Sequence, residues 1–301
     1  MRSSRGSMTL APPTVIVLDF DGTVTDAEAE GTPFRASYLA DLAALVGVTV
    51  EESRFAAIVA EVEAELGDNP EAHPFLWKGK AVAPAAVDPY LRMVPIADAI
   101  FDRYGVLADR TVRGRLTGEV LYRHNYALTK GLPVFRPGAA DVLRALAGTE
   151  TFIVSNSPTA VIADKLRQLD RHAGGGIAWL EARVRGDAHK FEIDDEWDGV
   201  PVSMAVPGLA TREVLLRRHR YHDRLAALLA TVGATWAELV VIGDIFELDL
   251  ALPLALGARV GLVASPHTPR YERDFVAAQP RARVLHSLAA IPDFIGLPAA
   301  R

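Results

Sequence analysis

The stretch VIVLDFDGTVTD, residues 15–26, decides the fold of this 301-residue chain. Its first four residues are apolar and mostly β-branched, and the run closes on Asp19, Phe20, Asp21 and Gly22. A short β-branched run that ends in an Asp-Gly turn is typical of a buried strand in a parallel sheet. We therefore predict a strand at residues 15–18, followed directly by two carboxylates.

The second half of the chain alternates between helix and strand patterns. We predict helices after Arg136-Pro137-Gly138, after the cap pair Ser157-Pro158 and over about 211–231, with a capping box at Thr235-Trp236-Ala237-Glu238. The further predicted strands cover residues 151–155, 177–184, 239–243, 259–264 and 283–285. This alternation predicts an α/β fold, a doubly wound parallel-sheet (Rossmann-like) core with helices on both faces.

A helical block interrupts this pattern between about residues 33 and 130. Apolar residues such as Phe55, Ile58, Val59 and Val62 recur at helix spacing, whereas residues 67–88 contain several Pro and Gly and predict a loop. We therefore predict a separate, mainly α-helical cap domain at residues 31–130, inserted after the first strand. The core domain would then consist of residues 10–30 and 131–301.

The composition excludes several classes of function. The net charge of −6 gives no support for general binding to nucleic acid or to anionic membranes. The absence of cysteine excludes disulfides, thiolate metal sites and cysteine nucleophiles. The apolar run at 15–18 is too short for a signal peptide, and no run approaches the length of a membrane span. We expect a cytoplasmic protein without nucleic-acid or membrane partners, and the sequence does not indicate its oligomeric state.

Polar residues follow three of the predicted strands. They are Asp19 and Asp21 after the first, Ser155-Asn156-Ser157 after the second, and Gly243-Asp244, with Asp249 five residues later, after the third. Ligands bind at this edge of an open parallel sheet. Phosphoryl transfer needs a nucleophile, a proton donor and positive charge near the phosphate. Two carboxylates can divide the first two tasks, a third helps to hold Mg²⁺, and a hydroxyl with helix N-terminal amides suits a phosphate.

These motifs carry a family resemblance. VIVLDFDGTVTD, TFIVSNS (151–157) and VVIGDIFELD (240–249) resemble the first, second and fourth signatures of the haloacid dehalogenase-like superfamily, in its phosphatase type with a helical cap after the first motif. The resemblance implies a doubly wound core, a mobile cap and Mg²⁺-dependent hydrolysis of a small phosphate monoester through an aspartyl-phosphate. Asp19 would be the nucleophile and Asp21 the general acid and base.

The resemblance also implies the ligands of the site. Asp19, the backbone carbonyl of Asp21 and Asp244 would hold Mg²⁺, with Asp249 in its outer shell. Gly22, Ser155 and the backbone around Asn156 would bind the phosphate.

The third signature of the family is only a lysine at loose spacing, and we choose Lys190 over Lys165. Lys165 lies eight residues past Ser157, roughly 12 Å along a helix that leads away from the phosphate end. We expect its ammonium to reach water. Lys190 follows the predicted strand at 177–184 through the turn Gly186-Asp187, so it can return to the active edge. There its ammonium would pair with Asp19 and bind phosphate, within about 6 Å of that carboxylate.

Several alternatives stay open at this point. A phosphomutase would use the same core residues, and a phosphonate hydrolase would need a cap lysine, Lys78 or Lys80. A catalytically inactive, phosphate-binding regulatory module is the alternative from another class. Haloacid dehalogenation is disfavoured because it does not call for Asp21.

Residues outside these motifs are weaker candidates. Trp77, Lys78, Lys80, Arg123, His124 and Asn125 are possible contacts for a leaving group. The cluster Arg217–His222 is interpreted as a solvated helix face.

Overall fold

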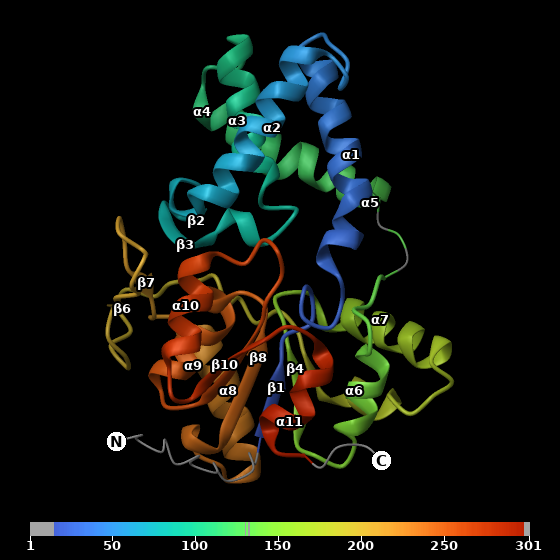
Figure 1. Ribbon diagram of the computed structural model, residues 1–301, viewed down its shortest axis with the longest axis vertical. Helices are drawn as coiled ribbons and strands as arrows, with labels where there is room; N and C mark the ends of the chain where they lie inside the picture. Colours follow the sequence, from blue (N-terminus) through green and yellow to red (C-terminus); the bar gives the residue numbers. More distant parts are fainter. Residues whose placement is uncertain (1–14, 130, 132, 298–301) are drawn as a thin grey trace, which may run out of the picture.

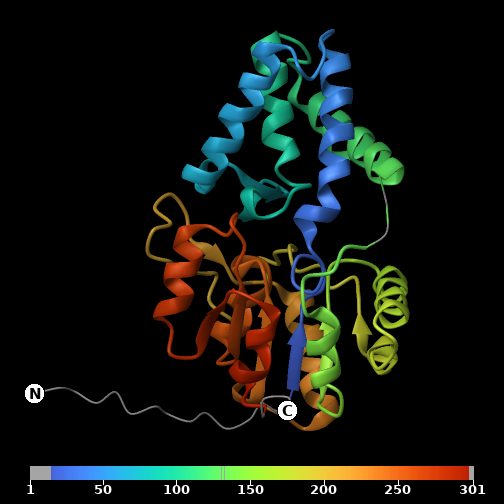
Figure 2. The same ribbon diagram turned by 45° about the vertical axis from the view of Figure 1, so that its right-hand side comes forward.

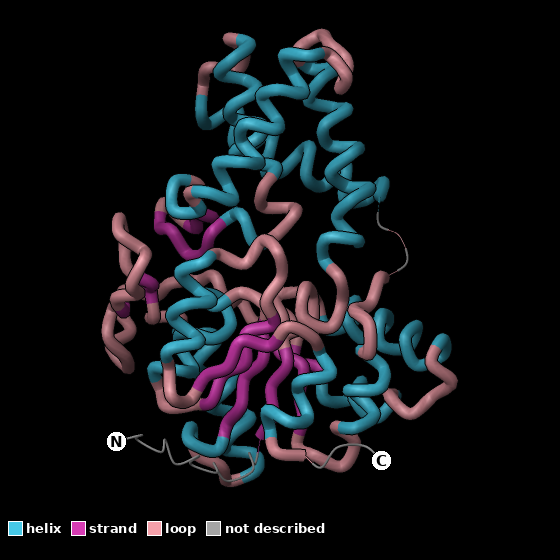
Figure 3. Tube along the Cα trace, in the orientation of Figure 1, coloured by secondary structure: helices cyan, strands magenta, loops and turns pink. Residues whose placement is uncertain are grey.

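The structure, a computed structural model, describes residues 15–129, 131 and 133–297. An α/β part lies below a helical part, and two connections, on either side of residues 27–129, join them (Figures 1 and 3). Residues 10–14, 132 and 298–301 of the predicted core, and residue 130 at the end of the predicted cap, lie outside the described residues. We keep the division at residues 31 and 130 as a proposal.

A six-stranded parallel sheet forms the α/β part, as predicted. Its strand order is β10-β9-β8-β1-β4-β5, and each neighbouring pair is parallel. The strands are β1 (Val15–Leu18), β4 (Thr151–Val154), β5 (Val184–Arg185), β8 (Leu239–Gly243), β9 (Arg259–Val263) and β10 (Ala282–Leu285). The first strand is therefore central, and the chain winds outward from it in both directions. Figure 2 shows β1 pointing toward the helical part.

Alternate residues of β1 pack into two different cores because side chains alternate across a strand. Val15 and Val17 belong to the core with α8 (His219–Val232), α9 (Ala251–Ala255) and α10 (Arg270–Ala278). Ile16 and Leu18 belong to the core with α6 (Ala139–Ala145), α7 (Thr159–His172) and α11 (Ile291–Ile295). Both faces of the sheet are thus covered, which is why the strand is apolar throughout.

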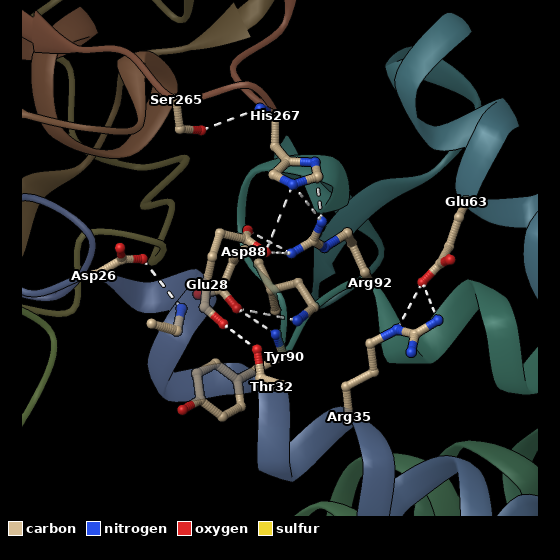
Figure 4. A network of polar contacts seen from close by, with 12 residues as sticks. Asp26, Glu28, Thr32, Arg35, Glu63, Asp88, Tyr90, Arg92, Ser265 and His267 are labelled. Carbon is tan, nitrogen blue, oxygen red and sulfur yellow. Dashed lines mark hydrogen bonds and ion pairs between the residues drawn. The ribbon is translucent and has the colours of Figure 1, made fainter. Parts of the chain in front are cut away.

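The helical part has a hydrophobic core of its own. Its elements are α1 (Ala27–Leu45), α2 (Ser53–Asp68), the hairpin β2 (Pro74–Trp77) and β3 (Lys80–Pro84), α3 (Met93–Tyr104), α4 (Arg110–Arg115), a π-helical stretch (Leu116–Leu121) and α5 (Tyr122–Thr129). In α2, Phe55, Ile58, Val59 and Val62 are buried, as their spacing predicts. Asp26 begins α1 by accepting a hydrogen bond from the amide of Ala29 (Figure 4).

Three predicted elements are wrong. Residues 67–88 contain the hairpin β2–β3 rather than only loop. Ala178–Arg183 is a 3₁₀ helix, and only Val184–Arg185 is strand, because Ile177, Leu180 and Val184 are buried at helical rather than alternating spacing. The helix predicted at 211–231 begins only at His219, after the hairpin β6 (Ser203–Met204) and β7 (Val214–Leu215). The capping box at Thr235–Glu238 is confirmed.

Polar contacts join the two parts at the loop after β9 and at the segment between β6 and β7. Within the helical part, Arg92 forms an ion pair with Glu28 at the start of α1. Its guanidinium also lies 3.0 Å from Nδ1 of His267, in the loop after β9 (Figure 4). Glu71 accepts hydrogen bonds from the amides of Ala210 and Thr211, at 2.8 and 2.9 Å. No helix among the described residues has both the length and the apolar character needed to cross a membrane.

Candidate active site

The carboxyl ends of β4, β1 and β8 meet at one edge of the sheet because these strands are neighbours. Asp19, Asp21, Ser155, Asn156, Asp244 and Asp249 line one cavity of about 470 Å³ there. Its opposite wall comes from the helical part, so the cavity lies between the two parts. The structure thus brings together the residues that the sequence singled out, with Lys190 directly beneath them.

Lys190 is buried between two carboxylates. Its Nζ donates to Oδ1 of Asp19 at 2.6 Å and to Oδ1 of Asp249 at 2.7 Å, and the residue is only 1% exposed. This is the short distance to Asp19 that we predicted for Lys190. Burial disfavours the charged form, but the two carboxylates outweigh it and raise the pKa of Lys190. The ammonium therefore stays charged.

A strained loop delivers Lys190 to this position. Asp187 and His189 have φ of 50° and 49°, in the left-handed region that side chains rarely adopt. The amide of Ala188 donates to the carbonyl of Ser155 at 3.0 Å, and the amide of Lys190 donates to Oδ1 of Asn156 at 2.7 Å. The side chain of Asn156 therefore fixes the lysine loop, a contact that the sequence did not indicate.

Two residues of the basic cluster at 217–222 hold the backbone of Lys190 and of Asp249. Arg218 is fully buried and donates to the carbonyl of Lys190 and, at 2.8 Å, to that of Val82 in β3. The interpretation of this cluster as a solvated helix face is therefore wrong for Arg218, which precedes α8. Tyr221 is also buried, and its hydroxyl donates to the carbonyl of Asp249 at 2.9 Å. No motif marked either residue, because their partners are backbone carbonyls of distant segments.

Three carboxylates lie close enough to share a cation. Single oxygens of Asp19, Asp244 and Asp249 all lie within 4.8 Å of one another. Gly22 permits this approach, because a Cβ there would lie 2.1 Å from Oδ2 of Asp244 and its φ is 85°. Both oxygens of Asp249 already accept hydrogen bonds, from Lys190 and from the amide of Ile245.

Burial and mutual repulsion change the acidity of this group. Burial raises the pKa of Asp19 to about 7. Lys190 lowers this pKa, whereas Asp249 and Asp21 raise it further. Burial, followed by Asp19 and Asp249, raises the pKa of Asp244 well above its usual range. Both shifts have the direction expected for close carboxylates, and a bound cation would reverse it.

Asp21 faces the cavity and is held from two sides. Its Oδ2 accepts from the hydroxyl of Ser155 at 3.2 Å, and its Oδ1 accepts from Nζ of Lys165 at 2.9 Å. Lys165 also pairs with Glu30 of α1 at 2.9 Å. Our expectation that Lys165 reaches water was wrong. Helix α7 begins at Thr159, so Lys165 is about 9 Å from its start, and helical side chains tilt back toward the N-terminus.

The helical part contributes aromatic and acidic residues to the cavity wall. Tyr90, Tyr122 and Tyr126 line it together with Asp88 and Glu30. None of the cap residues proposed from the sequence lines it. Lys80 pairs with Asp195, Lys78 lies over the ring of Trp77, and Asn125 is buried. No sequence pattern marked the three tyrosines as cavity residues, because they come from two separate segments, before α3 and in α5.

A doubly wound parallel sheet with carboxylates at its central strand ends and a helical part above them defines a Rossmann-like α/β protein. Among solved structures, a haloacid dehalogenase-like protein of unknown function from Agrobacterium tumefaciens strain C58 is 17% identical, with a TM-score of 0.51, covering 94% of this chain and 97% of that one. A predicted phosphoglycolate phosphatase from Haemophilus somnus 129PT is 13% identical, with a TM-score of 0.50, covering 93% and 96%.

The chain therefore has the fold of the haloacid dehalogenase-like hydrolases, and the resemblance in its three motifs is confirmed at the level of the fold. No protein-family profile matches the chain. No curated protein sequence matches it either.

Proposed function

We propose that this protein is a Mg²⁺-dependent phosphatase that hydrolyses a small phosphate monoester through an aspartyl-phosphate on Asp19. One observation carries the proposal. The carboxylate of Asp19 lies at the cavity floor against the ammonium of Lys190, while Asp21 faces the same cavity two residues further on. A nucleophile paired with a fixed positive charge, beside a second carboxylate, is what phosphoryl transfer requires.

The carboxylates fit a hard divalent cation. Asp19, Asp244 and the backbone carbonyl of Asp21 would bind Mg²⁺, with Asp249 oriented behind them by Lys190 and Ile245. Such a cation would neutralise the phosphate and the carboxylates, which otherwise repel each other.

The remaining residues divide the work. Asp19 attacks phosphorus, and Asp21 gives a proton to the leaving alkoxide and later takes one from the attacking water. The hydroxyl of Ser155, which contacts Asp21, and the ammonium of Lys190, which contacts Asp19, would bind phosphate oxygens. The helical part excludes water from the cavity and contacts the leaving group.

The geometry bears on the alternatives. Lys78 and Lys80 do not line the cavity, which disfavours a phosphonate hydrolase that depends on a cap lysine. Asp21 in the cavity favours phosphatase over dehalogenase, and the full set of carboxylates disfavours an inactive binding module. Because a phosphomutase would retain the phosphoryl group, measurement of released phosphate distinguishes it.

Hydrolysis of p-nitrophenyl phosphate tests the proposal directly. We expect Mg²⁺-dependent release of both p-nitrophenol and phosphate, and loss of nearly all activity in EDTA, because the carboxylates then repel the substrate. Excess MgCl₂ added after EDTA should restore the rate. Activity that EDTA leaves unchanged would show that no cation is needed.

Lys165→Met should reduce turnover because it disturbs the proton donor Asp21, and it should leave the nucleophile Asp19 in place. The ammonium of Lys165 holds the carboxylate of Asp21, so its loss should misplace the proton donor. We expect kcat/KM for an alkyl phosphate to fall on the order of 10–100-fold. It should fall much less for p-nitrophenyl phosphate, whose leaving group needs little protonation. The control is Arg171→Met, which removes a charge from the exposed face of α7. Equal losses on both substrates would contradict this positioning role.

A further inference from the structure

The charged side chains that line the cavity are mainly acidic. Among the described residues that line it, the only cation is Lys165, whereas six carboxylates do so, those of Asp19, Asp21, Glu30, Asp88, Asp244 and Asp249. The charge of Lys165 is already matched by Asp21 and Glu30, at 2.9 Å each. The positive charge of a bound divalent cation and the negative charge of the phosphate group would offset one another. The rest of the cavity would therefore stay negative.

Asp88 and Glu30 extend this negative charge from the catalytic carboxylates into the helical part. Asp88 lies between β3 and α3, where its carboxylate accepts from the amide of Tyr90 at 2.7 Å and of Leu91 at 3.2 Å (Figure 4). These two amides hold the carboxylate in place. Glu30 lies on α1, where the amide of Val134 also donates to it at 3.1 Å.

Three tyrosine rings form the neighbouring wall. Tyr122 and Tyr126 stack at 5.9 Å between ring centroids, and Tyr90 meets them edge-on at 6.3 and 6.0 Å. None of their hydroxyl groups donates to another residue in the described part of the chain. Tyrosine faces attract cations, because the ring quadrupole is negative above its plane.

We propose that the substrate is the phosphate monoester of an amino alcohol, whose ammonium group binds between the tyrosine wall and the carboxylates of Asp88 and Glu30. This inference rests on the proposed function and adds its substrate class. A leaving group that carries a carboxylate or a second phosphate would be repelled by these two carboxylates. An ammonium at the same place gains from both the carboxylates and the rings.

A set of substrates of matched shape tests the charge alone. Phosphocholine and 3,3-dimethylbutyl phosphate have the same shape, but only the first is cationic. Phosphoethanolamine and phosphoglycolate supply a second comparison, of an amine with a carboxylate. With Mg²⁺ and the full-length protein, we expect kcat/KM for phosphocholine to exceed that for its neutral isostere by about 10-fold or more. Phosphoethanolamine should exceed phosphoglycolate by about 100-fold or more.

Two variants locate the preference. Asp88→Asn keeps an acceptor for the two amides but removes the charge, and Tyr126→Leu removes one ring of the wall. Each should reduce the ratio of kcat/KM for phosphocholine over its neutral isostere toward one. Asp68→Asn is the control for net charge, because Asp68 is an exposed residue at the end of α2 outside the cavity, and it should leave the ratio unchanged.

The outcomes separate this inference from the proposed function. Three results would overturn the substrate class alone, provided that p-nitrophenyl phosphate is hydrolysed. They are equal rates on the cationic and neutral esters, a preference for phosphoglycolate, and no turnover of either amino alcohol ester. Absence of hydrolysis of every ester overturns the proposed function. In that case the affinity of the protein for phosphocholine against its isostere, measured by calorimetry with Mg²⁺, still decides whether the wall selects a cation.

Discussion

Asp19→Asn abolishes phosphatase turnover while the protein stays folded. The amide has nearly the shape of the carboxylate but lacks the anion that attacks phosphorus, so kcat should fall on the order of 10⁴-fold or more. The fold should survive, because the ammonium of Lys190 keeps its second carboxylate partner, Asp249, at 2.7 Å, and burial already disfavours the charged form of Asp19 and raises its pKa. Steady-state kinetics with p-nitrophenyl phosphate and far-ultraviolet circular dichroism measure the two effects.

Asp26→Asn is the matched control for this variant. Asp26 follows the same strand but lies at the start of α1, where its side chain accepts from the amide of Ala29 at 3.1 Å. Asparagine makes the same cap, so activity should stay near that of the wild type. If Asp19→Asn retained near wild-type activity in a clean preparation, Asp19 would not be the nucleophile.

Lys190→Met should impair both activity and stability. Without the ammonium, Asp19 and Asp249 are buried with no cationic partner, and breaking a buried ion pair costs about 3–5 kcal/mol in the free energy of unfolding. Mg²⁺ should recover part of this loss. The phosphate also loses its fixed positive charge, so kcat should fall about 10²–10³-fold. Urea unfolding with and without Mg²⁺ gives the first quantity, and kinetics give the second.

Lys78→Met is the control for Lys190→Met. Lys78 is exposed in the hairpin β2–β3, above the ring of Trp77, and its removal should change neither quantity measurably. A Lys190→Met variant that kept more than a tenth of the wild-type kcat would contradict the role of Lys190 at the phosphate.

The sequence by itself determined the sheet and the residues at its edge. Val15–Leu18 is apolar throughout because both faces of a central parallel strand are buried, and that signal is local. Asp19 and Ser155 directly follow such apolar runs, and Asp244 lies one residue beyond another. The convergence of parallel strand ends then predicts their proximity without further information.

Lys190 was predicted to lie near Asp19, but the predicted path to it was partly wrong. The strand expected at 177–184 is mostly a 3₁₀ helix, and left-handed residues in the following loop redirect the chain.

Only the tertiary structure decided which side chains surround the reacting groups. Lys165 reaches Asp21 because of where α7 begins and how helical side chains tilt, and Arg218 is buried because distant carbonyls of Lys190 and Val82 accept from it. The tyrosine wall joins residues from two segments, and no periodicity in either segment encodes their meeting. Sequence patterns report burial and local backbone preference, whereas such contacts depend on how whole elements pack.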